Sequence, residues 1–489
     1  MKITNDRAAF YGTLGETIDI YQAEHAVAAA FHQLGGRASS RGNRQRVVIG
    51  HDTNPASDMM EAAVSAALCA AGADVLTLGT VPSGAVSYLT ARCDALMGVM
   101  ITGGSFDYDA SGLKFYRSNG KPVTGELLQS IHAAIDSHTA LSSKQAGRIL
   151  KADSRVLNMY RHNLLTASNF TIFEKMKVAI DCINSATEQF VKDLFEQMGI
   201  DVAIYERDET LSDKPYQKSA AIAEFVKDSR SDIGFSFNVN GEICLVADAE
   251  GKLLDTEKLA AIFGRVLGSV PHDDTTPQTV MVSQSCHVAL ASYIKSMGAE
   301  CRIVTGDYSY LAEEFENFDA ASEEGQGVLM VADRDAGIVF PRISSVPDGL
   351  LTAVMLLTCL NRTGLTLSEL SRDIPKLIRN TCIVNIPSGA SLPTLNSTEL
   401  PDQIKMLRSY LSGDGRVVLT RPERTKIEII VEGVNPRQVE NVTEQTERLV
   451  RKSLQEKNGP IYQTPPAEKK AAPAPQQESN DIKKETKPS

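Results

Sequence analysis

Residues 98–116, GVMITGGSFDYDASGLKFY, combine a hydrophobic run with a turn of small residues, and the stretch closes with SGLKFY. A loop that directly follows a buried strand commonly carries functional groups, because the strand holds it in place. Gly103 and Gly104 have no side chain that could react. The candidate reactive groups of this stretch are therefore the hydroxyl of Ser105 and the amine of Lys114.

The composition is that of a large globular protein. At 489 residues the chain exceeds the size of one hydrophobic core, so we expect about three or four domains. Hydrophobic residues make up 42% of the chain, and its formal net charge is −11. A broad nucleic-acid surface would need clustered Lys and Arg, which this balance argues against. Small ligands or proteins are the expected partners.

No targeting or membrane segment is evident from the sequence. The N-terminus, MKITNDRAAFYG, lacks a basic region followed by an apolar run, and no apolar segment reaches the ~20 residues of a spanning helix. We therefore expect a cytoplasmic protein with no membrane partner. The eight cysteines show no C-x-x-C pair, which argues against a zinc site or a disulfide framework.

A strand, helix, strand pattern recurs along the chain. The first copy has a strand at 46–50, a helix at 59–72 and a strand at 73–79. The same order returns near 177–206 and near 279–306. Such units form parallel sheets covered by helices, so three α/β units of about a hundred residues each are predicted.

The pattern changes after about residue 375. β-branched runs at 381–387, 415–422 and 425–433 precede a helical segment at 438–455, which predicts a smaller α+β domain. From Asn458 onward the sequence is too poor in apolar residues to offset its chain entropy, so we expect a disordered tail, or alternatively a linker or docking peptide. The fold class is thus α/β: three similar α/β/α domains with mixed sheets plus a smaller C-terminal α+β domain. The expected domains are 1–155, 156–255, 256–375 and 376–457, with the tail at 458–489.

The sequences of several segments resemble motifs of the alpha-D-phosphohexomutase superfamily, which includes phosphoglucomutase and phosphomannomutase. They are most like those of bacterial phosphoglucosamine mutase. Members carry T-A-S-H-N-P followed by N-G-x-K, and this chain keeps the spacing from Thr102 to Gly112 and Lys114. Further segments resemble family motifs in the expected order, and together they span about residues 8–456. These are 10–18, 50–57, 78–86, 234–252, 321–327 and 417–433.

The resemblance implies four domains around a central cleft and a phosphoryl transfer between two hydroxyls of a sugar through a phosphoserine. In an ungapped alignment Gly104 stands at the serine position and Ser105 at the histidine position. One residue along the chain is about 3.8 Å, whereas in-line transfer tolerates misplacement of only about 0.5 Å. Ser105 is therefore either the nucleophile of a rebuilt loop or a capping residue in a glycine-rich turn.

The resemblance also implies a metal loop beside the phosphoserine. Asn238, Asn240 and Glu242 stand where the family has three aspartates, so two of three negative charges are missing. Mg²⁺ prefers anionic oxygens, and a unit charge about 4 Å away contributes on the order of 4 kcal/mol at an effective dielectric of about 20. We expect no high-affinity Mg²⁺ and no other cofactor, with Mg²⁺ bound only if the family site is retained. Alternatively, Asn240-Gly241 is a simple two-residue hairpin turn.

Two other family segments retain part of their chemistry. Glu323 matches the glutamate of the sugar-selecting loop and is the predicted substrate-binding residue. The terminal phosphate loop is two residues shorter than the family pattern, yet it keeps positive charge and hydrogen-bond donors. It is either an anion site or a solvated charged turn. The residues concerned are Arg421, Arg424, Thr425 and Lys426.

Three remaining positions bear on activity. Thr17 and Asn54 replace arginines of the family motifs, which removes bidentate phosphate donors. Lys114 is retained from the family, either as a catalytic group or as a solvated lysine at a strand edge. Loss of the nucleophile, the metal ligands and two arginines together suggests a scaffold without turnover.

Three functions follow from these residues. The first is a phosphohexomutase-like protein of carbohydrate metabolism that lacks mutase turnover and acts as a sugar-phosphate-binding or regulatory pseudoenzyme, with an active homologue or another protein as a possible partner. The second is an active intramolecular phosphotransferase, an isomerase on hexose or hexosamine phosphates, that uses rearranged residues such as Ser105 and Lys114. The third is a protein-interaction scaffold.

Overall fold

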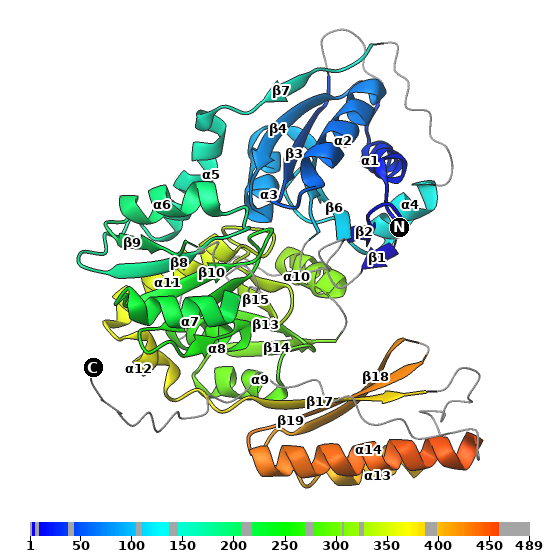
Figure 1. Ribbon diagram of the computed structural model, residues 1–489, viewed down its shortest axis with the longest axis vertical. Coiled ribbons are helices and arrows are strands. Elements are labelled where there is room, and N and C mark those ends of the chain that lie inside the picture. The colour runs from blue at the N-terminus through cyan, green and yellow to red at the C-terminus, as the bar shows by residue number, and fades with distance from the viewer. Residues whose placement is uncertain are drawn as a thin grey trace, which may run out of the picture. The chain divides into compact units, whose positions relative to one another are not determined.

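The computed structural model describes residues 2–4, 9–37, 44–103, 110–135, 145–206, 218–268, 278–305, 308–321, 327–386, 399–423 and 425–458. The chain divides into two compact units. The first unit consists of Met1–Cys286 and Leu290–Ile374, and the second of His287–Ala289 and Pro375–Ser489. Figure 1 draws the elements of both.

The first sheet contains seven strands of mixed direction. They are β1 (Lys2–Thr4), β2 (Ala9–Thr13), β3 (Arg46–His51), β4 (Asp74–Thr80), β5 (Ala95–Ile101), β6 (Ala110–Arg117) and β7 (Ile149–Lys151). Their spatial order is β1-β2-β6-β5-β3-β4-β7. The helices of this part of the chain are α1 (Ile20–Gln33), α2 (Ser57–Ala71), α3 (Ser83–Arg92) and α4 (Gly125–Ile135).

The second sheet contains five strands in the order β12-β11-β10-β8-β9. They are β8 (Lys177–Asp181), β9 (Asp201–Ile204), β10 (Ile233–Phe237), β11 (Cys244–Asp248) and β12 (Leu253–Leu254). The accompanying helices are α5 (Ser154–Ala167), α6 (Glu188–Gln197) and α7 (Lys218–Asp228).

The third sheet contains four strands in the order β14-β13-β15-β16. They are β13 (Thr279–Ser283), β14 (Glu300–Val304), β15 (Val328–Asp333) and β16 (Gly337–Val339). The helices around it are α8 (Thr256–Leu267), α9 (Val288–Ser296), α10 (Tyr308–Ala321), α11 (Gly349–Thr363) and α12 (Leu367–Ser371).

One arrangement of four strands occurs in all three sheets. In the first sheet β3 pairs in parallel with β4 and β5, and β6 then pairs antiparallel with β5. The strands β9-β8-β10-β11 and β14-β13-β15-β16 repeat both the order and the directions. The recurring pattern in the sequence therefore corresponds to a repeated structural unit.

Local sequence signals explain where the helices begin and end. α1 begins after Asp19, whose side chain accepts the N–H of Gln22 while the Gln22 side chain accepts the N–H of Asp19, a capping box. α2 ends at Gly72, which adopts a left-handed φ of 98° that favours glycine. α11 begins after Asp348, whose carboxylate accepts the N–H of Leu351 at 3.0 Å.

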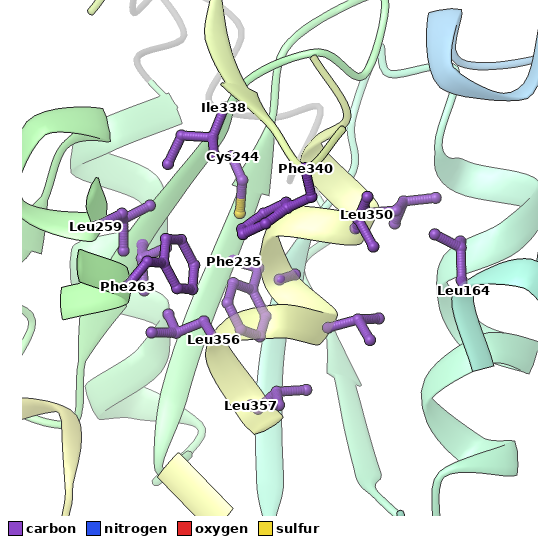
Figure 2. Packing of buried hydrophobic residues seen from close by; sticks show 14 of the residues in the cluster. Leu164, Phe235, Cys244, Leu259, Phe263, Ile338, Phe340, Leu350, Leu356 and Leu357 are labelled. Atoms are coloured by element: carbon purple, nitrogen blue, oxygen red, sulfur yellow. The ribbon is translucent and has the colours of Figure 1, made fainter. Parts of the chain in front are cut away.

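A continuous hydrophobic core runs through the parts of the first unit that contain the three sheets. Phe235 of β10 and Cys244 of β11 point toward Phe263 of α8, Phe340 and Leu356 of α11 (Figure 2). The rings of Phe263 and Phe340 meet edge to face, with centroids 5.1 Å apart. Full burial of a side chain of this size contributes about 1.5–3 kcal/mol. This shared core makes the first unit one compact body.

The second unit pairs a small antiparallel sheet with two helices. Its elements are β17 (Ile378–Asn385), β18 (Arg416–Glu423), β19 (Lys426–Gly433), α13 (Glu399–Arg408) and α14 (Pro436–Asn458). The strands lie in the order β17-β19-β18, and the helices lie along one side of them (Figure 1). Val384, Ile429, Val431, Val442 and Leu454 are buried between sheet and helices.

These observations confirm the predicted fold class, three similar α/β parts with mixed sheets and a smaller α+β part. The sequence pattern missed α13, and α14 runs one residue into the expected tail. The tail beyond it, 459–489, lies outside the described residues. The domain limits expected within the first unit stay predictions. No helix in the described part of the chain is long and apolar enough to cross a membrane.

Candidate functional site

Three equivalent connections carry the polar residues of interest. Each joins the last parallel strand of a sheet to its antiparallel neighbour: residues 102–109 between β5 and β6, 238–243 between β10 and β11, and 334–336 between β15 and β16. All three leave the carboxyl end of a parallel strand, where α/β proteins commonly bind ligands. The first two are the segments that resemble the catalytic loop and the metal loop.

The start of the first connection is held by a buried carboxylate. Asp52 is fully buried, and its Oδ2 accepts the N–H of Gly103 at 3.0 Å. Its Oδ1 accepts the Ser57 hydroxyl at 2.8 Å and the N–H of Asn54 at 2.9 Å. This network fixes the chain where it leaves β5. Ser105, the predicted nucleophile, lies in 104–109, outside the described residues.

Lys114 is buried in the middle of the first sheet. It pairs with Met100 of β5 on one side and with Ala9 of β2 on the other, so β6 is not an edge strand. Only 7% of Lys114 is exposed, and its ammonium forms an ion pair with the carboxylate of Glu242 in the second connection. The interpretation of Lys114 as a solvated lysine at a strand edge is therefore wrong.

The second connection is a six-residue loop closed by asparagine side chains. Phe237 and Cys244 form the last strand pair, so the interpretation as a two-residue Asn240-Gly241 hairpin is wrong. The Asn238 Oδ1 accepts the N–H of Ile243 at 2.9 Å, which replaces a bond of the strand ladder. The Asn240 Oδ1 accepts the Asn238 side-chain amide at 2.8 Å and the N–H of Glu242 at 3.3 Å.

These bonds decide whether the loop fits Mg²⁺. Mg²⁺ requires oxygens that point at a common centre and prefers carboxylates. Here the side-chain oxygens of Asn238 and Asn240 accept hydrogen bonds within the loop, and the carboxylate of Glu242 binds an ammonium. In the described ranges, no group of three or more His, Cys, Asp or Glu could hold a metal ion. The residues present do not fit the ion.

Two further groups lie close to this ion pair in the first unit. Burial, together with the charge of Glu242, raises the pKa of Tyr116 well above its ordinary value, so its hydroxyl stays protonated. Burial also raises the pKa of Asp348 to about 6, although hydrogen bonds from Leu351 and Tyr160 oppose the shift. The surroundings of Lys114 and Glu242 are thus strongly desolvated.

The third connection contains a polar cluster that the sequence pattern did not identify. Asp333 ends β15, and its carboxylate accepts the Ser285 hydroxyl at 3.1 Å and the N–H groups of Asp335 and Ala336 at 2.9 and 2.8 Å. The Arg334 guanidinium lies 2.8 Å from the carboxylate of Asp335. Glu323, the predicted substrate-binding residue, lies in 322–326, outside the described residues. Its role therefore stays a prediction, and the repeated strand order indicates 334–336 as a further candidate connection.

The predicted phosphate loop belongs to the second unit. Glu423 of β18 pairs with Lys426 of β19, so the connection between the strands is short. Arg421 and Thr425 are exposed there, Lys426 is half-buried, and the Thr425 carbonyl accepts the N–H of Ile386 at 2.7 Å. Arg424 lies outside the described residues.

The repeated sheets and their aligned connections define a protein of phosphohexomutase architecture. Residues 11–142 match the family model described as phosphoglucomutase/phosphomannomutase, alpha/beta/alpha domain I. The phosphoglucosamine mutase of Limosilactobacillus reuteri is 27% identical over 427 residues, which cover 85% of this chain and 91% of that protein. That of Ruminiclostridium cellulolyticum is 28% identical over 422 residues, covering 83% and 89%.

The fold is shared with solved structures, among them the following two. A phosphoglucomutase/phosphomannomutase family protein from Burkholderia thailandensis superposes with a TM-score of 0.71 at 17% identity, covering 92% of this chain and 97% of that one. The Aspergillus fumigatus N-acetylphosphoglucosamine mutase, in complex with GlcNAc-6P and magnesium, superposes with a TM-score of 0.59 at 14% identity, covering 88% and 96%. These similarities support the alpha-D-phosphohexomutase superfamily for this chain.

Proposed function

We propose that this protein binds a hexose or hexosamine phosphate and lacks phosphohexomutase turnover. One observation carries the proposal: the oxygens of Asn238 and Asn240 are used within their own loop, and Glu242 is paired with Lys114. Phosphoryl transfer depends on positioning and on neutralising the charge of the phosphoryl oxygens. Because these oxygens are already bonded, the connection does not hold a metal ion that would neutralise the phosphoryl charge.

Groups that suit a sugar phosphate remain on other connections. In the first unit, Arg334 and Ser285 carry a guanidinium and a hydroxyl of the kind that bind anions and sugar hydroxyls, and a ligand there would exchange with their present bonds to Asp335 and Asp333. In the second unit, Arg421 near the end of β18 and Thr425 just before β19 are both exposed and carry a guanidinium and a hydroxyl. The relatives are phosphoglucosamine mutases and a solved neighbour holds GlcNAc-6P, which favours amino sugar phosphates as the ligands to test first.

Turnover is tested with a coupled mutase assay on the purified full chain. The substrates are the 1-phosphates of glucose and glucosamine with glucose 1,6-bisphosphate as activator, in MgCl₂ and in EDTA. The Limosilactobacillus reuteri phosphoglucosamine mutase serves as the active control. We expect no turnover above the blank. Turnover that is lost in Ser105→Ala would contradict the proposal and establish an active phosphotransferase with a displaced nucleophile.

Covalent chemistry and binding are tested separately. Intact mass after incubation with glucose 1,6-bisphosphate is expected to show no added phosphate. A thermal-shift panel of hexose and hexosamine phosphates is expected to raise the melting temperature, because a ligand that binds the folded state alone adds about 2.7 kcal/mol at a hundredfold excess over Kd. No shift with any member of the panel would contradict sugar-phosphate binding and favour an interaction scaffold.

A further inference from the structure

Residues 238–243 touch all three parts of the first unit. The Asn240 carbonyl accepts the N–H of Ser83, the first residue of α3, at 3.0 Å. The Gly241 carbonyl accepts the N–H of Gly349, the first residue of α11, at 2.8 Å. The Asn238 carbonyl accepts the hydroxyl of Ser185, which lies between β8 of the second sheet and α6, at 2.7 Å. The connection thus links helices that follow strands of the first and third sheets to the second sheet.

The backbones at this junction approach so closely that glycine is required. A Cβ at Gly241, where φ is 70°, would lie 2.6 Å from the Cβ of Pro82. A Cβ at Gly337 would lie 2.8 Å from the Glu242 carbonyl oxygen, and one at Gly349 would lie 2.9 Å from the Gly241 carbonyl oxygen. These approaches leave no room for a side chain at any of the three glycines. The 238–243 connection and the segments packed against it are called the joint below.

The ion pair between Lys114 and Glu242 lies in the same joint. Lys114 belongs to the first sheet and Glu242 to the 238–243 connection of the second, and only 7% and 8% of these residues are exposed. A buried carboxylate without a cation is strongly unfavourable, and removal of one partner of a buried pair costs far more than loss of a surface pair. Glu242 therefore needs a permanent positive charge, and Lys114 supplies it from within the chain.

We propose that the Lys114 ammonium, through its ion pair with Glu242, holds the first sheet to the 238–243 connection of the second sheet. The joint then forms without any divalent metal ion. The connection that resembles a metal loop thus serves to hold the parts of the first unit together. This inference goes beyond the proposed function, because it concerns the assembly of the first unit and holds whether or not a sugar phosphate binds.

The first test compares the melting temperature of the purified full chain in EDTA and in millimolar MgCl₂ by scanning calorimetry. Equal melting temperatures are expected for the native protein. A higher melting temperature in MgCl₂ than in EDTA would overturn the inference, because it would show that the folded state binds the ion. A sugar phosphate is absent from both samples, so the outcome is independent of ligand binding.

The second test removes the ammonium. Lys114→Met is expected to lower the melting temperature by about 5 °C or more, because Glu242 is left buried and unpaired. The matched control is Arg117→Met, which breaks the ion pair of the same strand with Glu316, whose side chains are 31% and 22% exposed. A fall no larger for Lys114→Met than for Arg117→Met would overturn the inference.

A double variant guards against simple failure to fold. Lys114→Met with Glu242→Met removes both charges and keeps apolar volume, so it is expected to recover most of the lost stability. Hydrogen exchange adds a local measure: the amides of Ser83 and Gly349, which donate to the connection, should exchange faster in Lys114→Met than in Arg117→Met. If the double variant is no more stable than Lys114→Met, or the two amides are unaffected, the inference is wrong.

Discussion

Tyr160 of α5 donates a hydrogen bond of 2.8 Å to the carboxylate of Asp348, the residue that caps α11. Both side chains are buried, and they lie 188 residues apart in the chain. Burial raises the pKa of Asp348 from 3.8 to about 6, while the hydrogen bonds from Leu351 and Tyr160 hold it lower than burial alone would. An acid in this position makes the stability of the fold depend on pH.

The sign of that dependence follows from the raised pKa. Because its folded-state pKa is raised, protonated Asp348 contributes stability that is fully present below about pH 4. This contribution is lost as the pH rises through about 6 and the carboxyl ionises. The shift corresponds to roughly 3 kcal/mol as an upper value. Asp348→Asn is expected to remove the part of the pH dependence of the unfolding free energy that Asp348 contributes between pH 4 and 6, as urea titrations of both proteins at several pH values will show. An unchanged slope would contradict the assignment to Asp348.

Tyr160→Phe tests the hydrogen bond itself. Loss of the donor should cost about 1.5–3 kcal/mol at neutral pH, where Asp348 is charged, and less at pH 4, where it is protonated. Urea unfolding at both pH values measures the difference. Tyr88→Phe is the control, because its ring lies 6.3 Å from that of Tyr160 between centroids. Equal losses at both pH values for Tyr160→Phe would show that packing, rather than the hydrogen bond, matters there.

Gly241→Ala and Gly364→Ala separate a steric clash from backbone strain. Both glycines have positive φ, 70° and 65°, but a Cβ at Gly241 meets Pro82 and Thr187 within 2.8 Å, whereas Gly364 has no atom within 4 Å. Gly364→Ala should cost about 1 kcal/mol from the left-handed conformation alone. Gly241→Ala should cost at least about 2 kcal/mol more by chemical denaturation. Similar losses at both sites would contradict a tight joint at 238–243.

The sequence predicted the repeated α/β parts well, because short apolar strands and amphipathic helices leave a local pattern. It did not predict the partner of Lys114, since Glu242 lies 128 residues away and no local pattern joins them. The sequence predicted a two-residue turn at Asn240-Gly241, whereas the connection spans 238–243. Asn side chains replace backbone hydrogen bonds there, and the residue types of a turn do not reveal such bonds. The sugar loop expected at 321–327 lies largely outside the described residues and stays a prediction, while the strand order adds 334–336 as a separate candidate connection.

Arg334→Ala tests the third connection as a ligand site. If Arg334 helps to bind the phosphate or hydroxyls of the ligand, the variant should lose most of the thermal shift given by the best sugar phosphate of the panel. Loss of a charge-assisted hydrogen bond corresponds to about 1.5–3 kcal/mol of binding free energy. Arg155→Ala, an exposed arginine paired with Asp153 on α5, is the control and should keep the shift. A full shift in Arg334→Ala would exclude this residue from the ligand site.

Glu432 is the charged centre of the second unit. It is fully buried, and it accepts hydrogen bonds from Arg379 at 2.7 Å and from Arg416 at 2.9 Å. Burial alone would raise the pKa of Glu432, but the hydrogen bond from Arg416 and the charges of both arginines outweigh it and lower the pKa. A lowered pKa gives stability that is present above the ordinary value of 4.5 and is lost as the pH falls through the folded-state pKa.

Glu432→Gln should therefore destabilise the second unit by about 3 kcal/mol and remove its sensitivity to acid. Hydrogen exchange of the amides in β17 and β19 measures the effect in this unit. Glu428→Gln on the same strand is the control, since Glu428 accepts a hydrogen bond from the neutral Thr420 hydroxyl at 3.1 Å and should change stability by only about 1 kcal/mol. Equal exchange in the two variants would contradict a central role for Glu432.

A magnesium site should return when the internal cation is removed and the lost carboxylates are restored. Asn238→Asp with Asn240→Asp and Lys114→Ala leaves three carboxylates without a counter-ion, and their repulsion favours a divalent cation. We expect MgCl₂ to raise the melting temperature of this triple variant over its value in EDTA. The double variant Asn238→Asp with Asn240→Asp keeps Lys114 and should respond much less, because the ammonium still holds Glu242. An equal response of both variants would show that Lys114 does not exclude the ion.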